Sequence, residues 1–299
     1  MFKLFLSAVL AALLVVVPAN AGGKHAHNLS DAEKAIRSTE GKGAFSRSMV
    51  GTDNTMLGEP LPQGITRDEL SHLVFGTAFD KLKKDDLSGL AAVPYPGRPG
   101  LFVGAGGIKV YADSNCANSY VHLSLIVFKM DAPHKFVVVA KTAQPLQFDQ
   151  GGLRVAGRDP NYPEDELVKI DRSPFQIAQD QFAFGIRLAH NVGYAGGTGY
   201  AEFLHLFVID GATIRPVFST LIYDLQNLAG DWNKDQTRQH IVYENKYVVA
   251  VNPAMKAGYH DLAVRQSFGG RYSGIYKWDT GSKSYESAGK EAIIFSDNQ

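Results

Sequence analysis

Apolar and polar residues follow two different spacings along the chain. In the first third the spacing is helical, with one short run over residues 31–40 behind Ser30. A second run begins with Thr66 and Glu69, which have the spacing of a capping box. Residues 77–90 are expected to add a further helix. The sequence therefore predicts a short helical preface.

From Leu101 onward, β-branched and aromatic residues dominate, and their spacing indicates strands. Three hairpins are predicted, each with an aromatic residue shortly before the aspartate of its turn, as in Phe128 and Asp131. Their strands are 120–130 with 136–140, 203–209 with 214–218, and 274–278 with a return through Tyr285. This recurrence favours a mainly β fold of antiparallel hairpins in a degenerate repeated unit, propeller-like or sandwich-like. The alternative is that unrelated hairpins simply turn on Asp and Gly.

The stretch between these two parts, Pro94–Gly100, holds three prolines and two glycines. Such a segment is too rigid and too broken for a helix or a central strand. We therefore expect a linker there, with a helical or irregular N-terminal region over residues 22–100 and a β-rich domain over residues 101–299.

The first 21 residues have the pattern of a secretory signal peptide. Lys3 precedes an apolar run from Leu4 to Val17, and Ala19 and Ala21 make a small-x-small cleavage site. No cysteine follows that site directly, so lipidation there is excluded. The sequence predicts a soluble periplasmic or secreted protein with no membrane insertion after cleavage. The rival interpretation is a membrane anchor, for which the apolar run is short.

Composition narrows the function classes further. The chain has 299 residues, of which 45% are apolar, and 30 basic residues balance 30 acidic ones. This apolar content excludes disorder as the main state, and the lack of cationic excess argues against a nucleic-acid partner. Cys116 is the only cysteine, so no intramolecular disulfide forms and stability must come from a buried core.

One loop has a family resemblance. Gly230–Asp235, with the sequence GDWNKD, resembles the G-D-x-N-x-D loop of FG-GAP and VCBS repeats in secreted β-propellers, and Gly258–Val264 is similar to a strand entry of the same repeats. The resemblance implies a propeller-related fold and a calcium site formed by Asp231, Asn233 and Asp235. Oxygen-bearing side chains at alternate positions suit such a hard cation. Calcium is the one cofactor that the sequence implies.

The same loop departs from the family pattern in two places. Gln236 replaces the glycine of the turn, and Gln239 or His240 stands where the family has an acidic ligand. Both changes weaken a calcium site. The alternative is a structural turn, in which the Asp231 carboxylate accepts backbone N–H bonds and Trp232 packs inward.

Compact catalytic signatures are absent from the sequence: there is no H-E-x-x-H, no paired-cysteine zinc pattern and no G-x-S-x-G. Gly104–Gly107 precedes a strand pattern, so a phosphate loop at a helix N-terminus is not expected. An active site dispersed over strands stays open. Its candidates are the histidines and the carboxylates near them in sequence, His122, His190, His205, Glu202, Asp210 and Asp224.

Aromatic residues beside glycine-rich loops are the candidate binding residues: Tyr194, Tyr200, Tyr272, Tyr276 and Trp278. Flat rings on loops bind sugars or proteins, whereas the alternative role is cross-strand packing.

Two function classes remain. The first, which we favour, is an exported non-enzymatic β protein that binds a protein or glycan of the cell envelope through these aromatics. The second is an exported hydrolase, which clustering of His190, His205 or His240 with carboxylates in one cleft would favour.

Overall fold

The structure is a computed structural model, and it describes residues 23–50, 60–82, 86–111, 119–148, 164, 166–194, 197–268 and 274–288. The expected signal segment, Cys116 and Tyr272 lie outside these residues. The helices are α1 (Leu29–Ala35), α2 (Thr39–Val50), α3 (Arg67–Phe75) and the 3-10 helix η1 (Gly76–Lys81). The strands are β1 (Lys24–Ala26), β2 (Leu87–Pro94), β3 (Leu101–Tyr111), β4 (Ser119–Ala132), β5 (Lys135–Lys141), β6 (Glu166–Ala178), β7 (Gln181–Tyr194), β8 (Gly197–Asp210), β9 (Thr213–Trp232), β10 (Arg238–Lys256), β11 (Tyr259–Phe268), β12 (Gly274–Asp279) and β13 (Ser284–Ser287).

Helices α1 and α3 begin at side-chain caps, as the sequence predicts, although the first cap is a different residue. Asn28, not Ser30, caps α1 by accepting from the Asp31 amide at 3.0 Å. The backbone is extended at Ile36, so the expected run over 31–40 is two helices. The capping box of Thr66 and Glu69 at α3 is confirmed.

The expectations for residues 77–100 are wrong. A 3-10 helix ends at Lys81, residues 83–85 lie outside the described residues, and strand β2 begins at Leu87, within the range of the expected helix. The segment 94–100 is the turn of a hairpin and not a linker, since Pro94 of β2 pairs with Phe102 of β3. Gly97 and Gly100 both have a φ of +79°, a conformation that glycine adopts without strain. The sheet therefore begins before residue 101.

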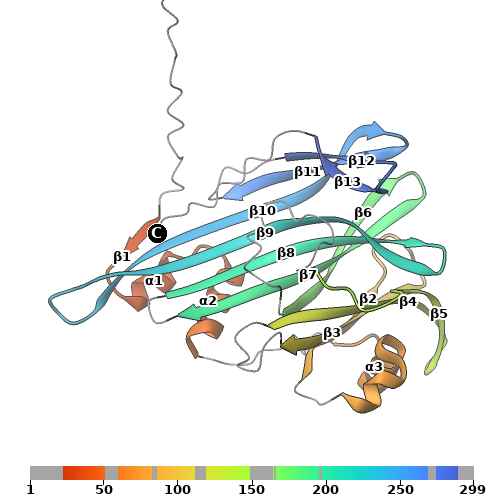
Figure 1. Cartoon of the computed structure of the whole chain (residues 1–299), viewed down its shortest axis with the longest axis horizontal. Coiled ribbons are helices and arrows are strands. Elements are labelled where there is room, and N and C mark those ends of the chain that lie inside the picture. Colours follow the sequence, from red (N-terminus) through yellow and green to blue (C-terminus); the bar gives the residue numbers. More distant parts are fainter. Residues whose placement is uncertain are drawn as a thin grey trace, which may run out of the picture.

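All three predicted hairpins are confirmed, as β4–β5, β8–β9 and β12–β13. They occupy three different places in the fold (Figure 1). Strands β6 to β11 form a closed six-stranded antiparallel barrel. The described strands belong to one hydrogen-bonded sheet, so the separate blades of a propeller are not seen among them.

The barrel closes unevenly. Strands β7 and β8 pair continuously from Phe184 and Phe207 to Tyr194 and Gly197. Between β11 and β6, in contrast, the described residues make a single register pair, Tyr259 with Ala178. Among the described residues, backbone pairing around the barrel is therefore sparsest between β6 and β11.

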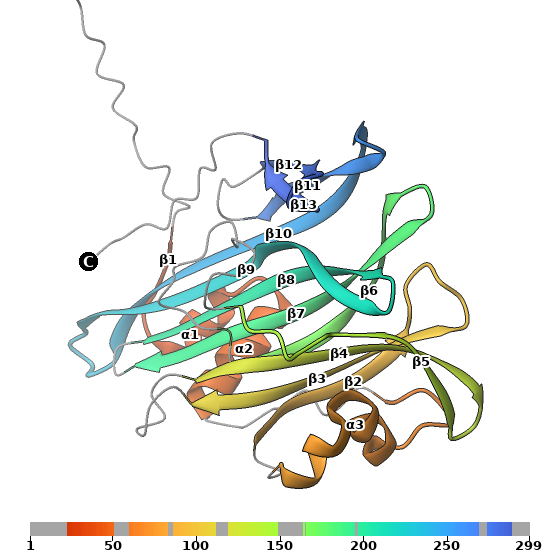
Figure 2. The same cartoon turned by 45° about the vertical axis from the view of Figure 1, so that its right-hand side comes forward.

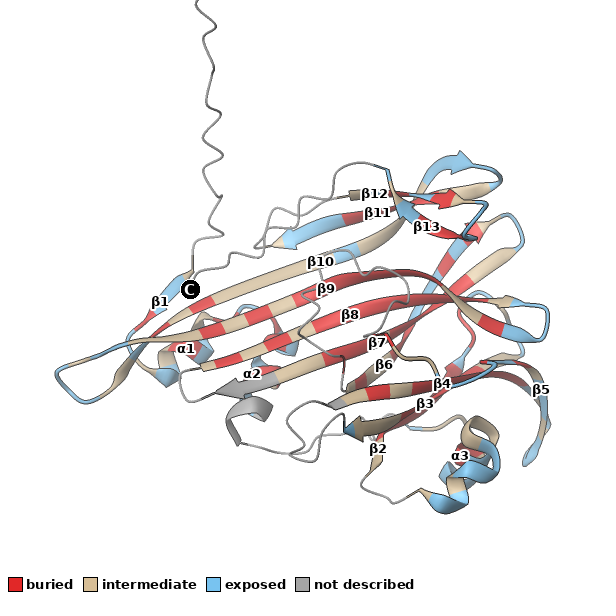
Figure 3. Ribbon diagram, in the orientation of Figure 1, coloured by how far each residue is buried: buried red, intermediate tan, exposed pale blue. Residues whose placement is uncertain are grey.

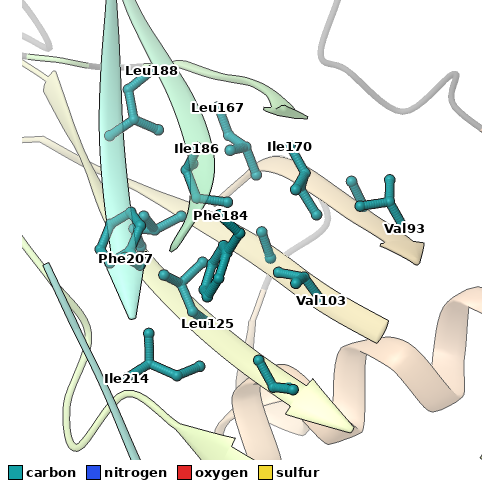
Figure 4. Close-up of a cluster of buried hydrophobic side chains, with 14 of the residues drawn as sticks. Val93, Val103, Leu125, Leu167, Ile170, Phe184, Ile186, Leu188, Phe207 and Ile214 are labelled. Carbon is teal, nitrogen blue, oxygen red and sulfur yellow. The ribbon is translucent and has the colours of Figure 1, made fainter. Parts of the chain in front are cut away.

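Strands β2 to β5 form an outer layer against the barrel (Figure 2). A short parallel pairing of Lys141 with Thr213 joins this layer to β9. Apolar residues of both layers meet in one buried cluster, shown in Figure 4, with Val103 and Leu125 from the outer layer facing Phe184 and Phe207 from the barrel. On the other side of the outer layer, α3 packs closely, and a Cβ at Gly106 would overlap the Phe75 ring.

The inside of the barrel has its own apolar cluster, to which all six barrel strands contribute, for example Leu204 and Leu206 of β8 and Leu262 of β11. A third cluster joins α1 and α2 to the other end of the same inner face, through residues such as Phe45 and Leu225. Figure 3 shows the middle of β8 and β9 buried and the far end of the β9–β10 hairpin exposed. In the described part of the chain, no helix has the length and apolar character needed to cross a membrane.

Candidate binding site

A layer of charged side chains lies inside the barrel, between the two apolar ends. Alternate residues of a strand point to the same face, so Glu202 on β8 points inward together with Leu204. On β7, Arg187 is paired with Leu204 and also faces the interior. On β6, Lys169 is paired with Arg187 and completes this part of the layer.

Arg187 is the centre of the layer. Its guanidinium donates to Asp171 Oδ2 from Nε at 3.0 Å and from Nη2 at 2.7 Å, and to Glu202 Oε1 from Nη1 at 2.9 Å. Burial opposes its charge, but Glu202 and Asp171 outweigh burial and raise the pKa of Arg187. Burial likewise opposes ionisation of Asp171, and Arg187 outweighs it, so the pKa of Asp171 is lowered. Both groups are charged at neutral pH.

A cavity of about 210 Å³ lies beside this ion-pair cluster. Its charged lining comes from α2 and four strands and consists of Glu40, Lys169, Asp171, Arg187, Glu202 and Lys246. The exposed fraction of the side chain falls from 46% at Glu40 to 4% at Glu202. The mouth therefore lies beside α2 and β10, where Val248 is also exposed, and Glu202 lies at the deep end.

The two lysines of the cavity differ in their surroundings. Lys246 donates to Glu40 Oε1 at 3.2 Å. The pKa of Glu40 is lowered, first by a backbone hydrogen bond and then by Lys246 and Lys169. Lys169 acts on Glu40 and Asp171 through its charge alone, because no carboxylate of the described residues lies within ion-pair distance of its ammonium.

Glu244 of β10 fastens helix α2 over the cavity. Its Oε1 accepts from the Ser38 amide at 3.0 Å, the Ser38 hydroxyl at 2.6 Å and the Tyr223 hydroxyl at 2.7 Å, and its Oε2 accepts from the Arg37 amide at 2.6 Å. Burial opposes ionisation, but these donors outweigh it and lower the pKa of Glu244. The fit is close, since a Cβ at Gly41 would overlap the Tyr223 hydroxyl.

The chain matches no family model, no curated protein and no solved structure. The residues of the cavity are therefore the guide to function. Most of them escaped the sequence reasoning, which named Glu202 only as a carboxylate near histidines. The available signal was a lone charge at an inward position of an apolar strand, such as Arg187 between Ile186 and Leu188.

Three of the predicted binding aromatics are buried, and one of them, Tyr200, contacts the cavity residue Glu202 by donating to its Oε2 at 3.2 Å. Tyr200 is 4% exposed, and Tyr276 and Trp278 are each 3% exposed. Trp278 stacks on Tyr259 with ring centroids 3.8 Å apart. Tyr194 is the last residue of β7, and Tyr272 is outside the described residues. Tyr200, Tyr276 and Trp278 therefore serve cross-strand packing, and they do not form an exposed surface.

The three expected calcium ligands lie at the end of the β9–β10 hairpin. The Asp235 carboxylate accepts from the Thr237 amide at 3.0 Å and the Thr237 hydroxyl at 2.6 Å, and it lies 2.9 Å from His27 Nε2. Asn233 donates to the His27 carbonyl at 2.7 Å. Two of the three side chains are thus occupied in closing the turn and in holding the segment after β1. Within the described residues, no group of three or more His, Cys, Asp or Glu side chains is placed to hold a metal.

The hydrogen bonds of this turn are made by other residues than the structural alternative names. The side chain that accepts a backbone N–H bond in the turn is Asp235, whereas Asp231 is exposed in β9. Trp232 does not pack inward. It is 69% exposed, and the Arg238 guanidinium carbon lies 5.6 Å from its ring centroid.

The histidines do not gather in one cleft. Strand register places His190 opposite Ala201 and His240 opposite Ala229. His240 contacts Asn227, with 3.0 Å between Nδ1 and Oδ1, and its pKa is lowered, mainly by burial.

His205 has both a carboxylate and a hydroxyl beside it. Its Nε2 lies 2.8 Å from Glu164 Oε2, and its Nδ1 lies 2.7 Å from Ser219 Oγ. This chain of a carboxylate, a histidine and a hydroxyl resembles a catalytic triad, except that each ring nitrogen contacts the partner that the other one has in a triad. However, His205 is fully buried, and the Phe148 ring centroid lies 4.1 Å from its own. Ser219 is itself 3% exposed, so its hydroxyl is shielded from solvent.

Proposed function

We propose that this protein is an exported, non-enzymatic binding protein that holds a small polar ligand in the barrel cavity. The observation that carries the proposal is the cavity wall of fixed charges beside Arg187. Charged groups taken out of water cost free energy unless partners satisfy them, and a polar ligand supplies such partners. Export remains an expectation from the signal pattern of residues 1–21.

This proposal keeps the binding class and changes the site. A macromolecular partner was expected through loop aromatics, but Tyr200 and Trp278 are buried. A cavity of about 210 Å³ suits a small molecule rather than a folded partner. The ion pairs of Arg187 hold the wall in one geometry before any ligand arrives, which reduces the entropy lost on binding.

Thermal melting with a mixture of small polar metabolites tests the proposal. We expect the mixture to raise the melting temperature of the wild type, because a ligand that binds only the folded state stabilises it. Val249 points into the cavity, so Val249→Trp places a bulky ring there and should abolish the rise. Ile275→Trp is the matched control, since Ile275 is 39% exposed on β12, away from the cavity. No rise in the wild type, or an equal rise in Val249→Trp, would refute the proposal.

The second candidate is the exported hydrolase, which the Glu164, His205 and Ser219 chain of contacts favours. Treatment with a fluorophosphonate probe separates the two candidates. We expect no labelling, because Ser219 is 3% exposed. Labelling of the wild type that Ser219→Ala abolishes would establish the hydrolase instead.

A further inference from the structure

We propose that the ligand of the cavity is an α-amino acid with an apolar side chain of about leucine size. The inference rests on the proposed function and names its ligand class. Three features of the lining carry it, namely balanced charges, a lysine with no ion-pair partner among the described residues, and an apolar wall.

The charges of the lining balance. Three basic side chains, Lys169, Arg187 and Lys246, face three acidic ones, Glu40, Asp171 and Glu202. A ligand with a single charge of either sign would leave one charge in excess in this partly buried cavity, and an unpaired charge is costly to the extent that it is buried. A zwitterion adds one charge of each sign and preserves the balance.

Lys169 indicates where the ligand carboxylate binds. Arg187 and Lys246 already donate to carboxylates of the protein, whereas the Lys169 ammonium has no such partner among the described residues. A carboxylate accepts charge-assisted hydrogen bonds from an ammonium group. The charge of Lys169 helps to lower the pKa of two carboxylates of the lining, Glu40 and Asp171. These two carboxylates are then the partners of the ligand ammonium.

The remaining wall is apolar. Phe175, Leu204, Ile222 and Val249 line the same cavity, and the first three belong to the buried cluster of the barrel interior. An aliphatic side chain placed against them loses contact with water at no polar cost. The volume, about 210 Å³, accommodates a leucine-sized molecule.

Isothermal titration calorimetry of the mature protein tests this assignment with three probes. L-Leucine carries both charges, 3-methylbutylamine lacks the carboxylate, and 4-methylpentanoate lacks the ammonium. We expect leucine to bind and each analogue to bind at least tenfold more weakly. The amine leaves the basic side chains of the cavity without a ligand partner, and the carboxylate leaves the acidic ones without one. Equal affinity for leucine and either analogue would overturn the assignment.

A lysine pair supplies the matched variants. Lys169→Gln should weaken leucine at least tenfold and should not weaken 3-methylbutylamine, because the amine has no carboxylate to lose its partner and is itself repelled by the Lys169 ammonium. Lys234→Gln removes an exposed lysine of the β9–β10 turn and should change neither affinity. Unchanged leucine affinity in Lys169→Gln contradicts the assigned contact.

The failures of the two proposals are distinguishable. If leucine gives no heat while the metabolite mixture still raises the melting temperature of the wild type and not that of Val249→Trp, the amino-acid assignment is wrong and the cavity remains a binding site. If leucine gives no heat and the mixture gives no rise, both proposals fall.

Discussion

The anchor of helix α2 gives the sharpest test of how the site is built. Replacing Glu244 by glutamine removes one charge and changes little in size. Of the four hydrogen bonds that Glu244 accepts, three go to Oε1 and one goes to Oε2. A glutamine that keeps its oxygen at the Oε1 position turns an NH₂ group toward the Arg37 amide. One bond is then lost, two donors oppose each other, and the three remaining bonds lose the assistance of a charge.

The magnitude follows from these bonds. A hydrogen bond to a charged group contributes about 1.5–3 kcal/mol, and neutral acceptors contribute roughly half as much. Glu244 is only partly buried, which reduces the effect. We expect Glu244→Gln to lower the free energy of unfolding by about 2–3 kcal/mol at pH 7. The control Glu33→Gln changes an exposed residue of α1 and should stay within about 0.5 kcal/mol of the wild type.

Urea unfolding followed by circular dichroism measures this difference, and hydrogen exchange of the α2 amides shows whether the helix is released. The sign of the pH dependence is also fixed. The folded-state pKa of Glu244 is lowered from its ordinary value of 4.5, so the stability it contributes is complete above that value and is lost as pH falls through the folded pKa. Equal midpoints for Glu244→Gln and Glu33→Gln at pH 7 would refute the anchoring role.

Three further predictions concern single positions. Gly41→Ala should lower the free energy of unfolding by about 1–3 kcal/mol in urea unfolding, because the new methyl overlaps the Tyr223 hydroxyl, and the loss should shrink in a Tyr223→Phe background. In thermal melting, Asp235→Asn should destabilise the protein equally with calcium and with chelator, whereas Asp231→Asn should have no effect. A calcium-dependent rise in the melting temperature of the wild type that Asp231→Asn lacks would instead support a calcium site in this loop. Burial raises the pKa of Asp224 to about 6, so stability should decline as pH rises from about 4 to 6, and Asp224→Asn should remove that decline in melts across this range.

Sequence reasoning succeeds where the deciding signal is local. The Thr66 capping box and the three hairpins depend on residues within a few positions of one another, and all are found in the structure. It fails at residues 94–100, where prolines and glycines were taken to separate domains. The same residues make a hairpin turn that Tyr95 ties to the barrel by donating to the Phe182 carbonyl at 2.7 Å.

The site was out of reach for a related reason. Asp171, Arg187 and Glu202 meet across three strands, and their register is set by bulges and by barrel closure rather than by any short motif. The aromatics Tyr200 and Trp278 misled because a ring beside a glycine-rich segment has the same local sequence whether it faces solvent or core. Only the packing of distant strands decides between these two environments.

The ion pairs of Arg187 also constrain how the barrel folds. A slip of β7 by one residue against β8 would turn every side chain of β7 to the opposite face. Arg187 would then enter the apolar cluster between the barrel and the outer layer, and Glu202 would stay buried without its cation. Slipped pairings that are nearly neutral in an all-apolar strand thus become costly here. The charged layer therefore selects one alignment of β6, β7 and β8 during assembly. A shift by two residues keeps every side chain on its own face, so the hydrophobic alternation alone would oppose it less strongly than the ion pairs do.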